Sequence, residues 1–261
     1  MNVFKFRTIN DGYISLVKTL LSCPTSIEKI SFAGNGKGKF VNKKSRLHLR
    51  NVHIMFENPG EFTEFSVGCP ERSAVMNNYM ERERDMFDRG VIDADHMGNI
   101  SKIWKKISNP DSTINANYGY MVYHLKDAGN IKYSDKFISQ FEWCQNRLEQ
   151  NLHTLQAIMH FNRPKDQYVD NLDQPCTVFA QFTVEDNKLN FHSYMRSNDV
   201  IYGTPYNLAY FVVLQRRMTE YLNSKLKINL EVGYLHHNTT SLHLYLDKIQ
   251  IAKKIIGECQ Q

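Results

Sequence analysis

The spacing of apolar residues changes near the middle of the chain, from a helical period of about 3.6 residues to the two-residue alternation of strands. Apolar residues at helical spacing predict four helices, which begin near residues 11, 78, 134 and 206. Alternation predicts strands at residues 157–161, 177–184, 189–195, 228–235 and 241–246. The polar residues 185–187 predict a hairpin turn between the second and third strands. The order of these elements predicts the α+β class.

The length and composition suit one globular domain that spans residues 1–261. The chain shows no repeat of about 20 to 50 residues and no low-complexity stretch. No run approaches the roughly 18 to 20 apolar residues that a membrane-spanning helix needs, and the first residues lack the apolar core of a signal peptide. We therefore expect a cytoplasmic protein that has no membrane partner.

The net charge of +5 and the pI near 8.8 suit an anionic ligand without requiring nucleic acid, and we expect no nucleic-acid partner. The chain has an odd number of cysteines and no pair spaced as CxxC: Cys23, Cys69, Cys144, Cys176 and Cys259. This pattern argues against both a disulfide framework and a zinc site. We expect reduced thiols, any of which is a possible nucleophile, and no bound metal.

A stretch rich in glycine and basic residues, residues 32–50, leads into an apolar run. Its basic residues are Lys37, Lys39, Lys43, Lys44, Arg46 and Arg50. The spacing of its glycines matches neither the P-loop nor the GxGxxG motif, so nucleoside-triphosphate binding is not supported. The stretch is predicted to be a flexible basic loop, which either binds a phosphate group or is simply solvated.

Cys176 follows Pro175 at the start of a predicted strand, where a side chain is fixed by the sheet and can open onto a cleft. On position alone a structural role is favoured, because a free cysteine packs as a small hydrophobic residue. Arg196 lies beyond the predicted hairpin, and an arginine near a thiol favours the thiolate, which is the nucleophilic form. Cys176 is therefore a candidate nucleophile.

Motifs on both sides of this cysteine resemble the active-site core of thymidylate synthases and the related phage deoxynucleotide hydroxymethylases. They are Gln174-Pro175-Cys176, Gln181-Phe182, Arg196-Ser197-Asn198-Asp199-Val200, Gly203-Thr204-Pro205-Tyr206-Asn207 and Ser241-Leu242-His243-Leu244-Tyr245. The resemblance extends over residues 78–246. The runs at residues 115–119 and 195–200 are more similar to the hydroxymethylases than to the synthases.

The resemblance implies a fold and a mechanism. The fold is a mixed sheet packed with helices in a homodimer, and the activity is one-carbon transfer to a pyrimidine nucleotide. The thiolate of Cys176 adds to C6 of the pyrimidine, and C5 then attacks the one-carbon unit of 5,10-methylenetetrahydrofolate. Glu83 matches the general acid/base that relays protons through water. From the residues alone, Glu83 is predicted to be a solvated charge on a helix.

The resemblance also implies roles for residues around the nucleophile. Arg196 contacts both the nucleotide phosphate and the cysteine, and Ser197 adds a hydroxyl to the phosphate site. Asp199 contacts the pterin, and Trp104 packs against the folate. Tyr118 belongs to the catalytic water network.

Further positions match the residues that bind the sugar and the base. His243 and Tyr245 match the pair that binds the 3′-hydroxyl, and Gln181 lies in a substrate-binding motif. From the residues alone, His243 is a core histidine and Tyr245 is half-buried. Asn207 meets the pyrimidine edge, where an amide reads uracil while cytosine-using relatives tend to carry aspartate. The alternative for Asn207 is a helix N-cap, which is compatible with the same role.

Two departures from the family pattern bear on the substrate and the product. Thr154-Leu155-Gln156 replaces a Ser-Arg-Arg whose arginines, by the resemblance, reach the partner's phosphate, so either other cations compensate or the substrate differs. The candidates for compensation are Lys37, Lys39, Lys43, Lys44, Arg46, Arg147 and Arg163. Residues 255–261 do not resemble the apolar tail that seals the synthase site, and an open site favours addition of water over hydride.

The sequence therefore predicts 5-hydroxymethylation of dUMP. Three alternatives stay open: a thymidylate synthase, a hydroxymethylase of cytosine nucleotides, and a retired homologue that binds nucleotides or RNA.

Overall fold

The computed structural model describes residues 2–22, 28–32, 42–126 and 138–258. The described strands form an eight-stranded sheet in the order β1-β3-β8-β6-β5-β4, while β2 pairs with β3 and β7 with β8. The strands are β1 (Asn2–Phe6), β2 (Glu28–Phe32), β3 (Asn42–Phe56), β4 (Ile158–His160), β5 (Thr177–Glu185), β6 (Lys188–Met195), β7 (Asn198–Asp199) and β8 (Glu231–Tyr245). The sheet is mixed, because β1 with β3, and β6 and β7 with β8, are parallel while the other pairs are antiparallel.

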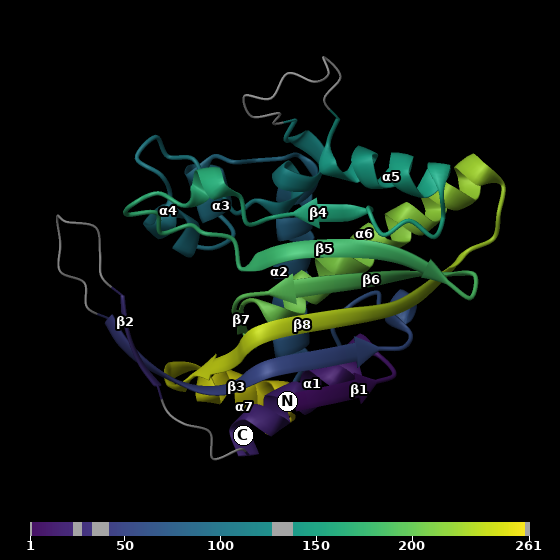
Figure 1. Cartoon of the computed structure of the whole chain (residues 1–261). Helices are drawn as coiled ribbons and strands as arrows, with labels where there is room; N and C mark the ends of the chain where they lie inside the picture. Colours follow the sequence, from purple (N-terminus) through teal and green to yellow (C-terminus); the bar gives the residue numbers. More distant parts are fainter. Residues whose placement is uncertain (1, 23–27, 33–41, 127–137, 259–261) are drawn as a thin grey trace.

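The helices gather on one face of this sheet (Figure 1). They are α1 (Ile9–Ser22), α2 (Pro70–Asp88), α3 (Ala94–Gly98), α4 (Ile103–Ile107), α5 (Gln140–Gln150), α6 (Thr204–Leu226) and α7 (Ile249–Ile255). Helix α1 packs against β1 and β3, and α6 packs against β6 and β8. The structure thus confirms the predicted α+β class. No described helix has the length and apolar character to cross a membrane.

Alternation along the central strands explains why one face is covered. On β8, Leu235, His237 and Thr239 are buried, whereas His236 and Asn238 between them are half-buried. The long helix α6 packs against β6 and β8 and against α5, α2 and α1, and nearly all of its residues 204–214 are buried. Each fully buried Leu or Phe side chain in such a layer contributes about 1.5 to 3 kcal/mol.

Three predicted boundaries are wrong, two of them because strand pairing overrides the local pattern. The two runs predicted after α6 form one strand, β8, since residues 236–239 pair with β3 on one side and with β6 on the other. Residues 42–50 belong to strand β3 and not to a loop, because they pair with β2 and β8. Helix α2 begins at Pro70, whose missing N–H suits a first helical turn.

The helix that was predicted to begin near residue 134 begins later in the structure. Helix α5 begins with Ser139 as its N-cap, where the hydroxyl accepts from the Glu142 N–H and the Glu142 carboxylate accepts from the Ser139 N–H. Ser134, the predicted start, lies outside the described residues.

Cys69 is disulfide-bonded, contrary to the expectation that all thiols are reduced, while Cys144 and Cys176 are free.

Candidate active site

Cys176 lies one residue before β5, and the main chain around it is held by Arg196. The Arg196 N–H donates to the Cys176 carbonyl at 2.9 Å, while its Nε and Nη2 donate to the carbonyls of Pro175 and Gln174 at 3.1 and 2.7 Å. Burial raises the pKa of the thiol, and the Arg196 charge partly opposes this rise. The guanidinium therefore fixes the segment that carries this candidate nucleophile, and its charge opposes the effect of burial on the thiol.

Tyr118 approaches the same segment from the loop before residues 120–124. Its hydroxyl accepts the N–H of Thr177 at 3.1 Å, and its ring packs against Phe161 with centroids 5.0 Å apart. Burial raises the pKa of Tyr118, so the phenol stays protonated and can donate a proton or a hydrogen bond. The next residue, Gly119, lies so close to the Phe87 carbonyl of α2 that a Cβ would sit 2.0 Å from it. A side chain here would push the Tyr118 loop away from α2.

Glu83 lies on α2 and is only 9% exposed, in contrast to the solvated charge predicted from the residues alone. The Tyr79 hydroxyl donates to its Oε1 at 3.0 Å. Burial raises the pKa of Glu83 to about 7, and the bond from Tyr79 opposes that rise. A carboxyl group that titrates near neutral pH is suited to both donating and accepting protons. Trp104 is half-buried and lies beside the Tyr79 hydroxyl.

Strands β7, β8 and β3 carry a second group of candidate site residues, of which Asp199 and Tyr245 interact electrostatically with Cys176. His243 and Tyr245 lie on one face of β8, with ring centroids 5.1 Å apart. Asp199 on β7 pairs in register with His243, and Arg46 on β3 pairs with Tyr245. Burial lowers the pKa of His243 to about 4, so its imidazole is neutral at neutral pH and has one donor and one acceptor nitrogen.

These side chains form one electrostatic group. Arg196, Asp173 and Asp199 all shift the pKa of the Cys176 thiol, and burial has the largest effect. Burial likewise dominates the raised pKa of Tyr245, to which Asp199 and then Cys176 contribute. Ser197 is half-buried between Arg196 and Asp199, where β6 leads into β7.

Asn207 lies in the first turn of α6 and is half-buried. The N-cap of this helix is Gly203, so the alternative in which Asn207 caps the helix is wrong. The Thr204 hydroxyl donates to Asn198 Oδ1, and Asn198 Nδ2 in turn lies 3.4 Å from Asn207 Oδ1. This chain of contacts directs the Asn207 oxygen toward Asn198, so the amide N–H groups point away from Asn198.

The structure does not bring Gln181 to this group. Its neighbours Ala180 and Phe182 are buried toward the helices, so its side chain points to the opposite face of the sheet. There its Nε2 donates to the Leu155 carbonyl at 2.8 Å. Sequence reasoning also missed Tyr79, whose four-residue spacing from Glu83 was the available signal.

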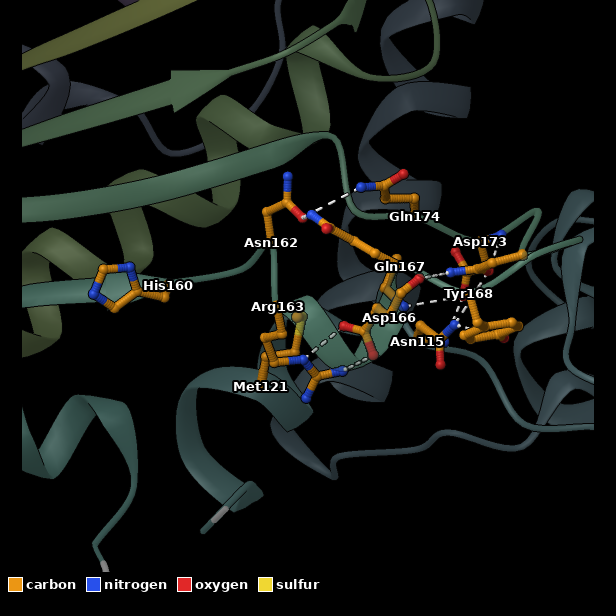
Figure 2. A network of polar contacts seen from close by, with 12 residues as sticks. Asn115, Met121, His160, Asn162, Arg163, Asp166, Gln167, Tyr168, Asp173 and Gln174 are labelled. Carbon is orange, nitrogen blue, oxygen red and sulfur yellow. Dashed lines mark hydrogen bonds and ion pairs between the residues drawn. The ribbon is translucent and has the colours of Figure 1, made fainter. Parts of the chain in front are cut away.

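Two of the predicted substitutes for the missing arginine pair are engaged elsewhere. Arg163 forms a two-pronged ion pair with Asp166, at 2.7 Å from Nε to Oδ2 and 3.0 Å from Nη2 to Oδ1 (Figure 2). Arg147 lies over the Trp143 ring at 4.5 Å. Arg196 acts on the Cys176 thiol through its charge, and Arg46 acts on His243 and Tyr245.

Four lysines among the predicted substitutes cannot be placed in the site. Lys37 and Lys39 lie outside the described residues, and Lys43 and Lys44 are described only as part of β3. Within the described ranges, no three or more His, Cys, Asp or Glu side chains are grouped so that they could hold a metal ion.

Known proteins are similar to this chain in sequence and in fold. Residues 86–260 match the thymidylate synthase family model, and this match begins just after Glu83. The deoxycytidylate 5-hydroxymethyltransferase of Enterobacteria phage T4 is 28% identical over 178 residues, which are 66% of this chain and 68% of that protein. The deoxyuridylate hydroxymethyltransferase of Bacillus phage SP01 is 27% identical over 76% of this chain and 50% of its own length.

Two synthases complete the comparison. The thymidylate synthase of Ascaris suum is 27% identical over 84% of each chain. The structure of the thermostable thymidylate synthase A from Bacillus subtilis superposes with a TM-score of 0.66 at 18% identity, covering 97% of this chain and 85% of that one. This likeness supports the fold, and the family match covers more than half of the chain. The chain therefore belongs to the thymidylate synthase family.

Proposed function

We propose that this protein transfers a one-carbon unit to C5 of dUMP and releases the 5-hydroxymethyl product. The observation that carries the proposal is the electrostatic group around Cys176, in which Tyr118, Arg196, Asp199 and Tyr245 all influence or respond to the thiol. The co-substrate 5,10-methylenetetrahydrofolate supplies the carbon when it is bound. Trp104 provides a flat indole surface for its pterin, and Asp199 provides a carboxylate for the pterin nitrogens.

The thiolate of Cys176 forms a bond to C6, and the electrons of the C5–C6 double bond move toward O4 of the base. C5 thereby becomes nucleophilic. Arg196 stabilises the thiolate before this step, since its charge lowers the pKa of the thiol. Glu83 then supplies and removes protons through water, because its pKa of about 7 populates both of its forms at neutral pH.

The orientation of the Asn207 amide favours uracil over cytosine. With its oxygen toward Asn198, the amide presents N–H to the ligand, which suits the O4 acceptor of uracil. Cytosine presents an amino donor at the same place, and two facing donors would leave a buried polar group unpaired. Such a mismatch costs about 1 to 3 kcal/mol.

The hydroxymethyl product is supported by the two phage relatives. Both relatives are hydroxymethyltransferases by name. In this route tetrahydrofolate and the C5 proton leave, which gives an exocyclic methylene on C5. Water then adds to the methylene as the Cys176–C6 bond breaks, and the product is the hydroxymethyl nucleotide.

The test is a product assay with dUMP, dCMP, UMP and CMP, each incubated with 5,10-methylenetetrahydrofolate and resolved by mass spectrometry. We expect hydroxymethyl-dUMP and no dihydrofolate. The Asn207→Asp variant should shift the ratio of kcat/KM values toward dCMP by about 10- to 100-fold, because one hydrogen-bond mismatch is exchanged for another. A methyl product with dihydrofolate would overturn the hydroxymethyl assignment, and a wild-type preference for dCMP would overturn the reading of Asn207. Failure of all four nucleotides would favour a role in binding.

We also propose that the protein is a homodimer that joins through the sheet face left open by the helices. The Tyr194 side chain on this face is 39% exposed and stacks on Phe179 with centroids 5.8 Å apart. An aromatic pair facing solvent is typical of an interface. Sedimentation of the wild-type chain should give a dimer and the Tyr194→Glu variant a monomer, whereas a monomeric wild type would contradict the proposal.

A further inference from the structure

The segment that leads to Cys176 is folded around polar contacts rather than an apolar core (Figure 2). Arg163 and Asp166 form their ion pair at its start. The Asn162 side-chain oxygen accepts from Gln167 and from Gln174, each at 3.2 Å. These contacts give the residues before the nucleophile a fixed shape.

Asp173 connects this segment to the loop that carries Tyr118. Its side chain is buried, with the residue 2% exposed, and its Oδ2 accepts the N–H of Asn115 at 2.5 Å and the N–H of Ala116 at 3.0 Å. Its own N–H donates to Asn171 Oδ1 at 2.8 Å. Two N–H donors on one carboxylate oxygen tie together chain segments that are 57 or more residues apart.

The same two segments meet again on the other side of the nucleophile, where the Thr177 N–H donates to the Tyr118 hydroxyl. Cys176 therefore lies between two points of attachment, three residues after Asp173 and one before Thr177. A nucleophile must be held within a fraction of an ångström of its target, and a displacement of about 1 Å costs roughly 10²-fold in rate. The double attachment supplies that restraint.

Asp173 also acts on the thiol through its charge. Burial raises the pKa of Cys176, Arg196 lowers it, and the Asp173 and Asp199 carboxylates raise it. The other ionisable groups that face the thiol are Tyr118 and Tyr245. An asparagine at position 173 would offer an oxygen to the same two N–H groups without the charge, so the charge has an effect separable from the attachment.

We propose that Asp173 is a positioning residue that holds the Cys176 segment against the Tyr118 loop. The proposal rests on Cys176 being the nucleophile. The hydrogen bonds and the charge of the carboxylate can be measured separately. Loss of the hydrogen bonds should affect turnover, and loss of the charge should affect the reactivity of the thiol.

The experiment measures the rate at which iodoacetamide alkylates Cys176, identified by peptide mass spectrometry, as a function of pH. In Asp173→Asn, we expect the midpoint to move to lower pH, because a neighbouring negative charge is removed. Asp170→Asn is the matched control, since Asp170 is exposed in the same segment, and its profile should equal that of the wild type. An unchanged profile in Asp173→Asn would overturn the role of the charge.

The second variant, Asp173→Ala, removes the acceptor as well as the charge. We expect kcat on dUMP to fall by about 10- to 100-fold relative to Asp173→Asn. Equal kcat in the two variants would overturn the positioning role. If the alanine variant does not fold, the asparagine profile still decides the role of the charge. Alkylation requires no turnover, so a wild type inactive on every nucleotide would contradict the proposed function and leave the Asp173 measurement readable.

Discussion

Glu83 and Cys176, the two residues proposed to carry out the chemistry, lie in regions that are built differently. Glu83 projects from the long helix α2, where Tyr79, one turn earlier, donates to it and burial raises its pKa to about 7. Cys176 lies on a loop before β5, where polar contacts hold the chain and Arg196 opposes the effect of burial on the thiol. No cation contributes to the raised pKa of Glu83, whereas the Arg196 charge lowers the pKa of the Cys176 thiol. Burial therefore favours the protonated form of both groups, and at the thiol the Arg196 charge opposes that effect.

Removing the thiol is the largest perturbation of this pair. In Cys176→Ser, we expect turnover of dUMP to fall by a factor on the order of 10³ or more, since a hydroxyl is a far poorer nucleophile than a thiolate. The change is nearly isosteric, so the free energy of unfolding should change by less than about 1 kcal/mol and nucleotide binding should persist. Product assays and calorimetry measure the two effects, and turnover within tenfold of the wild type would exclude Cys176 as the nucleophile.

Replacing the carboxyl group should separate activity from stability. Glu83→Gln should lower kcat by about 10²- to 10⁴-fold, because the amide neither donates nor accepts a proton. The pKa of Glu83 is about 7 in the folded chain against an ordinary value of 4.5. The folded chain therefore binds the proton more tightly, and stability is lost as the pH rises from 4.5 through 7.

Above that range the ionised wild type bears a cost on the order of 3 kcal/mol, which the glutamine variant avoids. Urea unfolding should find Glu83→Gln more stable than the wild type above a pH of about 7 and equally stable below 4.5. A variant that is less stable at both extremes would show that Glu83 is not buried as an ionisable group. For Cys176→Ser, we expect the difference in stability from the wild type to be independent of pH over the same range.

The same contrast explains which parts of the molecule the sequence could predict. Strands β5 and β6 and their hairpin follow from local alternation, and the turn residues Asp186 and Asn187 adopt positive φ angles of 47° and 60°, as tight hairpins require. The motif around Cys176 is similarly local. Gln174, Pro175 and Cys176 are consecutive in the sequence, so the resemblance of this motif to the family could be recognised without the structure.

From the residues alone, the burial of Glu83 and the extended structure of residues 42–50 could not be predicted, because distant partners determine the surroundings of both. A charged helix residue is solvated unless other elements cover it, and here Tyr79 and Tyr206, whose rings lie 4.2 Å apart, are part of the cover. The basic residues of β3 are extended because β8 pairs with them nearly 200 positions later, as in Arg46 with Tyr245. Asp173 belongs to the same class, since its two N–H donors lie more than 50 residues away.

The smallest predicted effect concerns the hydroxyl that touches the carboxyl group. Tyr79 donates to Glu83 at 3.0 Å and thereby lowers the pKa of Glu83, so Tyr79→Phe should raise that pKa further. One hydrogen bond contributes about 0.5 to 1.5 kcal/mol, which corresponds to a shift of up to about one pH unit. The limb of the kcat/KM profile that Glu83 sets should move upward by that amount. Tyr234→Phe is the matched control, because it removes a similar 2.9 Å bond from a tyrosine to Glu185 on the open face of the sheet. A shift of equal size in both variants, or in neither, would mean that a group other than Glu83 sets this limb.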